Sequence, residues 1–270
     1  MDHIQPSPIV LGIALLAGLT ELAWRLRSGR GYDRADAWGS ARIAAGHVLV
    51  GLVNGALIAL VFSLVTRLMP VHWPLDDWRT WAAGFVLVEF GYYWFHRLSH
   101  ELRWPWATHI VHHSVEELTL LSSLRLGWTN FFSLGWIVYV PVVMAGFDLK
   151  LVLAILAVDL QYQFFLHTEA PIRLGPLEWV LNTPAHHRVH HACNGAYLDK
   201  NYGGMVIVFD RLFGTFAALK PGDTLQYGLV HPLRSRSTLE LAFGGWRQLF
   251  GEMRRAGSVG AALRLAVSRP

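Results

Sequence analysis

The chain of 270 residues is 53% hydrophobic and only 16% charged, and its mean hydropathy is +0.33. This composition is too apolar for an ordinary soluble protein, and it excludes intrinsic disorder, collagen-like repeats and small disulfide-rich scaffolds. The single cysteine, Cys193, cannot form an internal disulfide, so packing or metal must hold the fold. The net charge of +4 comes from arginines that border apolar runs instead of forming a basic stripe. We therefore expect a membrane bilayer as partner, and no nucleic acid.

Five apolar runs predict an all-α membrane protein with about four to five transmembrane helices. They cover residues 8–24, 43–69, 81–95, 126–147 and 151–166. The first run has no Lys or Arg before it and several arginines after it, which is the reverse of a cleavable signal peptide and predicts a retained anchor. The last two runs are joined by the polar residues Asp148 and Lys150 and are predicted to form a helical hairpin.

The distribution of charge predicts the orientation. Arg25, Arg27, Arg30, Arg34 and Arg42 lie between the first two runs, whereas Asp76, Asp77 and Arg79 lie between the second and the third. Short cytoplasmic loops carry an excess of Lys and Arg. The N-terminus is therefore expected outside, and the histidine-rich segments and the C-terminus in the cytoplasm.

The absence of repeats and linkers predicts one integral-membrane domain over residues 1–270, with a histidine-box region at about 85–216 and a basic cytoplasmic tail at 217–270. In this tail, apolar residues recur at helical spacing from Leu239 to Met253. We expect this stripe either to lie on the membrane surface or to dock on the domain.

Histidines dominate the candidate site. Residues three and four apart on a helix share a face, so each of three boxes, HxxxH, HxxHH and HxxHH, can present imidazoles to one centre. One tetrahedral ion needs about four protein ligands, so the boxes suffice for two metals. The predicted ligands are His96, His100, His109, His112, His113, His187, His190 and His191, with His167, which stands at the end of the fifth run. The isolated His3, His47, His72 and His231 are predicted to be bystanders.

The order of these boxes resembles the membrane-bound fatty acid hydroxylase and sterol desaturase superfamily. The strings EFGYYWFHRLSH at 89–100, HTE at 167–169, NTPAHHRVHH at 182–191 and DKNYGG at 199–204 look most like its alkylglycerol monooxygenase-like branch. Thr119 stands where that branch usually carries Asn. The similarity extends from about residue 89 to 216.

The resemblance implies two non-haem iron ions that use O2 to hydroxylate an unactivated C–H bond of a lipid, namely an ether lipid, a sterol, a fatty acyl chain or an amino-lipid. Its family ligands are the eight box histidines and His167. The residues agree with this chemistry, because activation of O2 needs a redox metal with open positions. The sequence contains no cytochrome domain and no GxGxxG fingerprint, so an external electron donor, such as a separate redox partner, or a reduced pterin is expected.

Three further residues are predicted to support the ligands. Glu89 and Asp159 lie inside apolar runs, where a carboxylate is costly and becomes a functional candidate. We interpret both as acceptors of a histidine N–H, which would fix the orientation of the ring. A buried polar pair that joins two helices is the alternative. His186, beside the third box, is interpreted as a hydrogen-bond partner of the ligands.

Other functions remain open from the residues alone. A lipid desaturase would use the same site. A membrane zinc hydrolase would need a glutamate inside a histidine pair, yet Arg97 follows His96, and Glu101 has no histidine at position 104. A bis-histidine haem protein needs just one histidine from each of two helices. A histidine-rich zinc-binding, storage or transport protein has the same ligand count.

Overall fold

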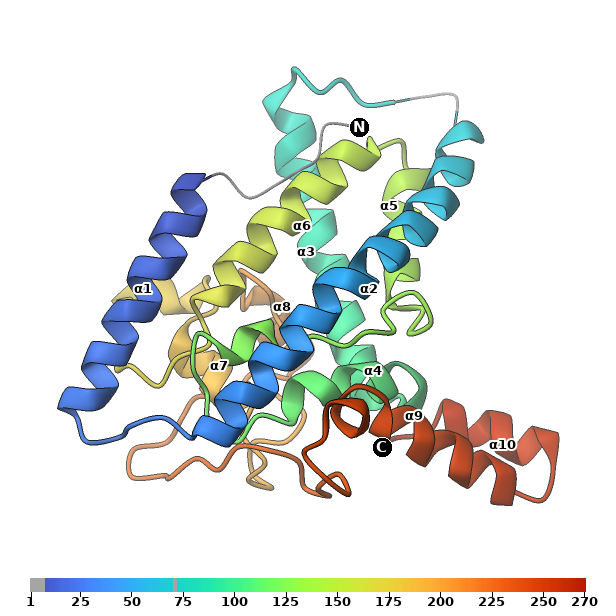
Figure 1. The fold of residues 1–270 in the computed structure, drawn as a ribbon. Helices are drawn as coiled ribbons and strands as arrows, with labels where there is room; N and C mark the ends of the chain where they lie inside the picture. The colour runs from blue at the N-terminus through green and yellow to red at the C-terminus, as the bar shows by residue number, and fades with distance from the viewer. Residues whose placement is uncertain (1–7, 70–71) are drawn as a thin grey trace.

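The computed structural model describes residues 8–69 and 72–270, and over this part the secondary structure is helical, with two isolated β-bridges (Figure 1). The all-α prediction is confirmed. The predicted bystander His3 lies outside the described residues. The helices are α1 (Pro8–Arg27), α2 (Arg34–Arg67), α3 (Trp78–Glu101), α4 (Arg103–His113), α5 (Val140–Met144), α6 (Leu149–Phe164), α7 (Pro184–His190), α8 (Val208–Phe213), α9 (Thr238–Arg255) and α10 (Val259–Ala266), with the 3-10 helices η1 (Ser122–Leu124), η2 (Gly135–Tyr139) and η3 (Gly175–Trp179).

Aspartates begin three of the long helices. The side chains of Asp33, Asp77 and Asp148 accept hydrogen bonds from free N–H groups in the first turns of α2, α3 and α6, respectively. These N–H groups have no partner inside the helix, so a side-chain acceptor stabilises the helix start. The cap at Asp33 explains why α2 begins nine residues before the apolar run that starts at Ile43.

The predicted helical hairpin is wrong in its first arm. Residues 126–147 do not form one helix: their first part is irregular, and only η2 and the short α5 follow. Leu134 adopts a left-handed φ of 62°, which interrupts a helix. The side chain of Asn54 in α2 donates to the carbonyl of Trp128 and accepts from the N–H of Phe131. It thereby satisfies backbone groups that a helix would otherwise satisfy itself.

The helix bundle has two well-separated ends. At one end, the N–H of Trp73 donates to the carbonyl of Gly146 over 3.0 Å, so the starts of α3 and α6 lie together. At the other end, Arg236 forms ion pairs with Asp33 and Glu116. An apolar core contributed by α2, α3, α5 and α6 lies nearer the first end, and it contains Phe62, Val88, Val142, Leu151 and Ile155.

Two helices, α1 and α2, are long and apolar enough to cross a membrane by length and composition. Both leave most of their surface uncovered, and on α2 Leu49 and Leu52 are 72% and 74% exposed. Two long apolar helices with most of their surface uncovered would be unusual on a soluble monomer. The two helices therefore indicate association with a membrane.

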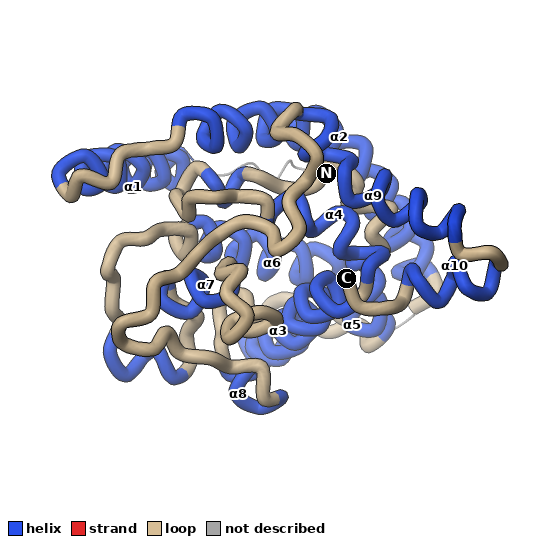
Figure 2. The backbone as a smooth tube through the Cα atoms, turned by 90° about the horizontal axis from the view of Figure 1, so that it is seen from below, coloured by secondary structure: helices blue, strands red, loops and turns tan. Residues whose placement is uncertain are grey.

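The C-terminal stripe docks on the domain with one face. Leu241, Ala242, Trp246 and Leu249 of α9 pack against α4 and α2. At Gly245, a Cβ atom would lie 2.6 Å from the carbonyl oxygen of Ala107, so glycine allows α9 to approach α4 closely. Leu239 and Phe243 stay exposed. Seen from the end of the bundle, α10 and α1 project on opposite sides (Figure 2).

Candidate metal centre

Four elements carry the nine predicted ligands. His96 and His100 lie in the last turns of α3, the second box lies in α4, and the third lies in α7 and at its C-cap. His167 follows α6. The chain turns between α3 and α4 at Leu102, which has an extended conformation, and Pro105 then sits in the first turn of α4, where its missing N–H is not needed. In α7, Thr183 caps the helix and Pro184 begins it.

The structure brings all nine predicted ligands together in two groups, each with its ligand nitrogens within 4.8 Å of one another. The five-histidine group consists of His96, His100, His109, His113 and His190. The four-histidine group consists of His112, His167, His187 and His191. Among the described residues, neither group includes a carboxylate or a thiol.

Because of the helical period, the histidines of each HxxHH box are divided between the two groups. In the second box, His109 and His113 are four residues apart and join the five-histidine group, while His112 points to the other. The third box divides in the opposite sense, with His187 and His191 in the four-histidine group and His190 in the five-histidine group. Adjacent residues on a helix point about 100° apart, so neighbouring histidines serve different centres.

Burial keeps these rings neutral, which is the form that binds metal. Burial lowers the pKa of His112 to about 4. It also lowers the pKa of His113, His167 and His187 well below the ordinary value, and neighbouring histidines lower it further.

Backbone carbonyls orient four of the rings. The Nδ1–H groups of His96 and His190 donate to the carbonyls of Tyr202 and Lys200 over 2.8 and 2.9 Å. His167 donates to the carbonyl of Gln163 over 2.8 Å, and His112 donates to that of Arg125 over 3.3 Å. A neutral imidazole has one N–H, so each bond leaves the Nε2 atom of that ring with a free lone pair.

The Nε2 atoms fit a metal ion better than they fit one another. The Nε2 atoms of His112 and His167 lie 3.1 Å apart, and His187 places its Nε2 atom 3.0 Å from that of His167. For His112 and His167, both lone pairs face each other, which is repulsive unless a cation lies beside them. Two nitrogens bound at right angles to one ion at about 2.1 Å would be about 3.0 Å apart. The donor set and its spacing therefore suit a metal in the four-histidine group.

The five-histidine group has the same character. The Nε2 atoms of His96 and His109 lie 3.1 Å apart, as do those of His113 and His190. The buried Nε2 atom of His100 has no hydrogen-bond partner in the described structure. An unpaired buried nitrogen is costly, and a bound ion would satisfy it.

Among the described residues, no histidine N–H donates to Glu89 or Asp159, so this interpretation is corrected. Glu89 accepts from the N–H of Val206 over 3.1 Å, and Asp159 accepts from the side-chain amide of Gln163 over 2.7 Å. The two buried carboxyl groups also interact electrostatically with each other. Seven residues along a helix correspond to about 10.5 Å, so Glu89 shares a face with His96 but cannot reach it. The alternative, a buried polar pair that joins α3 and α6, describes these residues.

His186 also lies apart from the ligand rings that it was expected to support. Its ring packs edge-on against Phe216, with centroids 5.3 Å apart. Its carbonyl accepts a hydrogen bond from the side chain of Asn201. The adjacent His187 points into the four-histidine group instead, because the two side chains leave α7 in different directions. Of the bystander histidines, His47 approaches the carbonyl of Gly127 with Nδ1, and neither group includes His47, His72 or His231.

Sequence reasoning missed several residues that hold the site. The buried carboxylate of Asp210 accepts hydrogen bonds from the N–H groups of Tyr202 and Gly203, each over 2.7 Å. Glu21 and Arg25 are buried in α1, and their side chains contact the segment after His167. The rule that singled out Glu89, a charge inside an apolar run, applies equally to Glu21 and could have found it.

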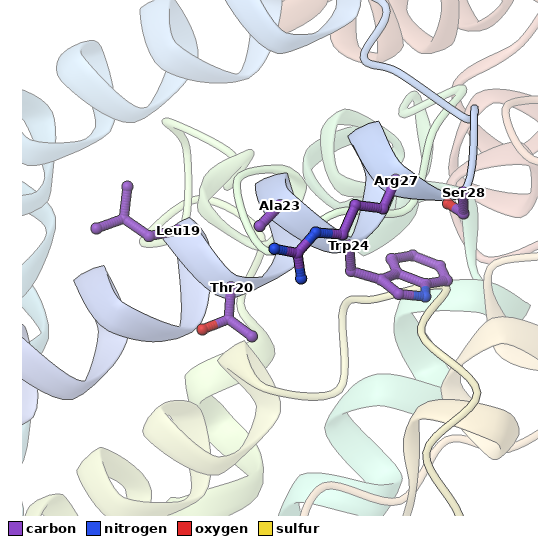
Figure 3. Close-up of a pocket in the computed structure, with 6 residues that line it drawn as sticks. All are labelled: Leu19, Thr20, Ala23, Trp24, Arg27 and Ser28. Atoms are coloured by element: carbon purple, nitrogen blue, oxygen red, sulfur yellow. The ribbon is translucent and has the colours of Figure 1, made fainter.

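A separate groove lies along α1. It has a volume of about 640 Å³ and is lined by Leu19, Thr20, Ala23, Trp24, Arg27 and Ser28, all from one side of the helix (Figure 3). None of the nine clustered histidines lines it, so the groove is distinct from the metal centre.

Comparisons with known proteins match this region of the chain. Residues 81–215, half of the chain, match the family model described as fatty acid hydroxylase. Alkylglycerol monooxygenase of Homo sapiens is 44% identical over 171 residues, which are 63% of this chain and 37% of the relative. The enzyme of the same name from Danio rerio is 48% identical over 164 residues, or 59% and 35% of the two chains. Ornithine lipid hydroxylase OlsE of Rhizobium tropici is 32% identical over 154 residues, or 57% and 46%. The chain thus spans less than half the length of these relatives, and no solved structure matches it.

Proposed function

Because the chain belongs to the fatty acid hydroxylase family, we propose that it is an O2-dependent membrane oxygenase that hydroxylates an unactivated C–H bond of a lipid at a di-iron centre. The observation that carries this proposal is the pair of neighbouring groups of buried, neutral histidines. Nine nitrogen donors exceed the needs of one ion and suit two. Desaturation of a lipid on the same site is the alternative.

Some residues of the chain would bind the two iron ions, and others hold the ligand rings in place. The five-histidine and four-histidine groups would hold one iron ion each. When bound, the iron pair supplies the redox chemistry that activates O2. The carbonyls of Tyr202, Lys200, Gln163 and Arg125 hold the rings in place, as supporting hydrogen bonds do in other metal sites. Burial of the rings keeps bulk water away from the centre.

A zinc hydrolase is a weaker interpretation of this geometry. Such an enzyme needs a carboxylate that acts as general base beside the metal. Neither histidine group includes a carboxylate among the described residues, and the buried pair Glu89 and Asp159 bonds to Gln163 and Val206 instead.

We place the protein across the membrane with four to five spans, formed by α1, α2, α3 and α6, with α5 as a short partner of α6. Exposed tryptophans support this placement, because Trp is enriched at both membrane interfaces. Trp73 and Trp78 are 52% and 74% exposed near the start of α3, and Trp38 is 63% exposed near the start of α2, at the other end. The arginines near Trp38 support an orientation in which that end and the histidine groups face the cytoplasm and the N-terminus lies outside.

The substrate that we propose is a membrane lipid with a long alkyl chain and a polar head group. The names of the relatives, alkylglycerol monooxygenase and ornithine lipid hydroxylase, support this class. Electrons would come from a separate redox partner or a reduced pterin.

Metal analysis and lipid analysis together test the proposal. Protein purified without chelator from iron-rich medium should carry about two iron atoms per chain and show no haem absorption. His100→Ala and His187→Ala should each lose about one iron, whereas His47→Ala should keep both. Lipid extracts of cells with and without the gene, compared under oxygen, should differ by a product that has gained one oxygen atom. A single tightly held zinc, or a lipid profile that does not change, would contradict the proposal.

A further inference from the structure

We propose that the two metal sites are held by two separate frameworks: the N-terminal helices α1 and α2 position the four-histidine group, and the segment 199–215, which includes α8, positions the five-histidine group. This inference rests on the proposed function, because it assumes two bound ions. It gives α1 and α2, which precede the matched family segment, a role beyond membrane anchoring.

Glu21 is the main link from α1. Its carboxylate is buried, with the residue 5% exposed, and it accepts hydrogen bonds from the hydroxyl of Thr168, the N–H of Leu120 over 2.8 Å and the hydroxyl of Tyr32 over 2.9 Å. Thr168 directly follows His167. Removal of the carboxylate would leave three donors without their acceptor. The segment that carries His167 would then lose this one of its attachments to α1.

Arg25 reinforces this link one turn further along α1. It is 1% exposed and pairs with Glu169 over 2.8 Å and with Glu117 over 3.0 Å. Glu169 lies two residues after His167, and Glu117 lies in the segment after α4. The guanidinium of Arg25 is buried, while the side chains of Glu169 and Glu117 are 19% and 25% exposed. Loss of both carboxylates would leave a buried charge without compensation, which is costly.

The link from α2 reaches His112. The guanidinium of Arg125 is buried against Asp36 of α2 at 2.7 Å and also donates to the hydroxyl of Ser40. The carbonyl of the same Arg125 accepts the Nδ1–H of His112. Both ligands that receive support from α1 and α2, His112 and His167, belong to the four-histidine group.

A different framework holds the five-histidine group. Asp210, which is fully buried, accepts from the N–H groups of Tyr202 and Gly203 and from the hydroxyl of Thr215, each over 2.7 Å. This fixes the loop whose carbonyls, at Tyr202 and Lys200, orient His96 and His190. Both of these ligands belong to the five-histidine group. Glu21 and Asp210 are therefore positioning residues for different ions.

Iron release to a chelator separates the two ions. In the purified, iron-loaded full chain, Glu21→Ala should weaken retention of one iron by about ten- to a hundredfold, the usual scale for residues that support metal ligands, and Asp210→Ala should do the same to the other. Glu21→Gln should be intermediate, since its amide oxygen keeps one acceptor. Leu22→Ala, an exposed neighbour on α1, serves as the control and should release iron like the wild type.

Ligand variants identify which iron is affected. In a His100→Ala background, which retains the four-histidine site, Glu21→Ala should speed iron release. In a His187→Ala background, which retains the five-histidine site, Glu21→Ala should leave the rate of iron release unchanged. Asp210→Ala should speed iron release in the His187→Ala background and leave it unchanged in the His100→Ala background. Equal effects of Glu21→Ala in both backgrounds, with an unchanged helical circular dichroism spectrum, would overturn the inference alone. A wild-type chain with fewer than two irons would overturn the proposed function, and this inference with it.

Discussion

The buried ion pair between Arg125 and Asp36 gives the most quantitative prediction. Their side chains are only 2% and 6% exposed, and their charged atoms lie 2.7 Å apart. Arg125→Met would remove the guanidinium and leave the carboxylate of Asp36 buried without its partner. Breaking a buried pair in this way typically costs about 3–5 kcal/mol. In a chain of this size, about 1 kcal/mol lowers the Tm by about 2–4 °C, so we expect a loss of about 6–20 °C.

Thermal unfolding in detergent, followed by circular dichroism, measures this loss. The matched control is Arg79→Met, because Arg79 pairs with Asp77 at a similar distance, 2.8 Å, but its side chain is 75% exposed. Exposed pairs contribute at most about 1 kcal/mol, so the control should lower the Tm by less than about 4 °C.

A double variant separates the charge from the other contacts of Arg125. Arg125→Met with Asp36→Asn removes the unpaired charge, so its cost should be smaller than the sum of the two single costs by about 0.5–3 kcal/mol. The carbonyls of Ser114 and Asp36 still lose a donor, so stability should not return to that of the wild type. If Arg125→Met lowered the Tm no more than Arg79→Met does, the reasoning from burial would be refuted.

Two further predictions concern topology and packing. In a background without Cys193, a membrane-impermeant thiol reagent should label Arg34→Cys, Glu116→Cys and Ser235→Cys from one side of the membrane and Asp76→Cys from the other; labelling of Glu116→Cys together with Asp76→Cys would contradict the proposed orientation. Gly203→Ala should destabilise the protein by about 1–3 kcal/mol in thermal unfolding, because its Cβ atom would lie 2.1 Å from the carbonyl oxygen of Val206. Gly195→Ala, which has open space around it, is the control and should leave the Tm unchanged. Equal effects of the two substitutions would refute the packing argument.

The sequence was sufficient to predict that the eight box histidines cluster, because the spacing within each box is local. Four-residue spacing on a helix places His96 beside His100, and His109 beside His113, wherever the helix lies. The same rule placed Glu89 correctly on the face of His96. It could not show that Glu89 would accept a hydrogen bond from Val206, because the partner of a buried carboxylate depends on which segment packs opposite.

Hydropathy could not predict the irregular backbone between residues 126 and 134. Composition alone makes this segment resemble a membrane span. The left-handed Leu134 and the bonds from Asn54 to Trp128 and Phe131 depend on contacts with α2, which no local pattern contains. The all-α class and the two long apolar helices, by contrast, follow from composition and run length.

The division of each HxxHH box between two groups gives a reason for the third histidine in each box. The helices α4 and α7 both contribute to both groups, so they determine how far apart the two sites lie. A single box of two histidines four residues apart could serve one ion, and the third histidine is needed only if a second ion lies beside the same helix. In contrast, α3 serves the five-histidine group alone, and His167 serves the four-histidine group alone. Shared helices can thus keep the two sites at a fixed separation, while separate elements complete each site.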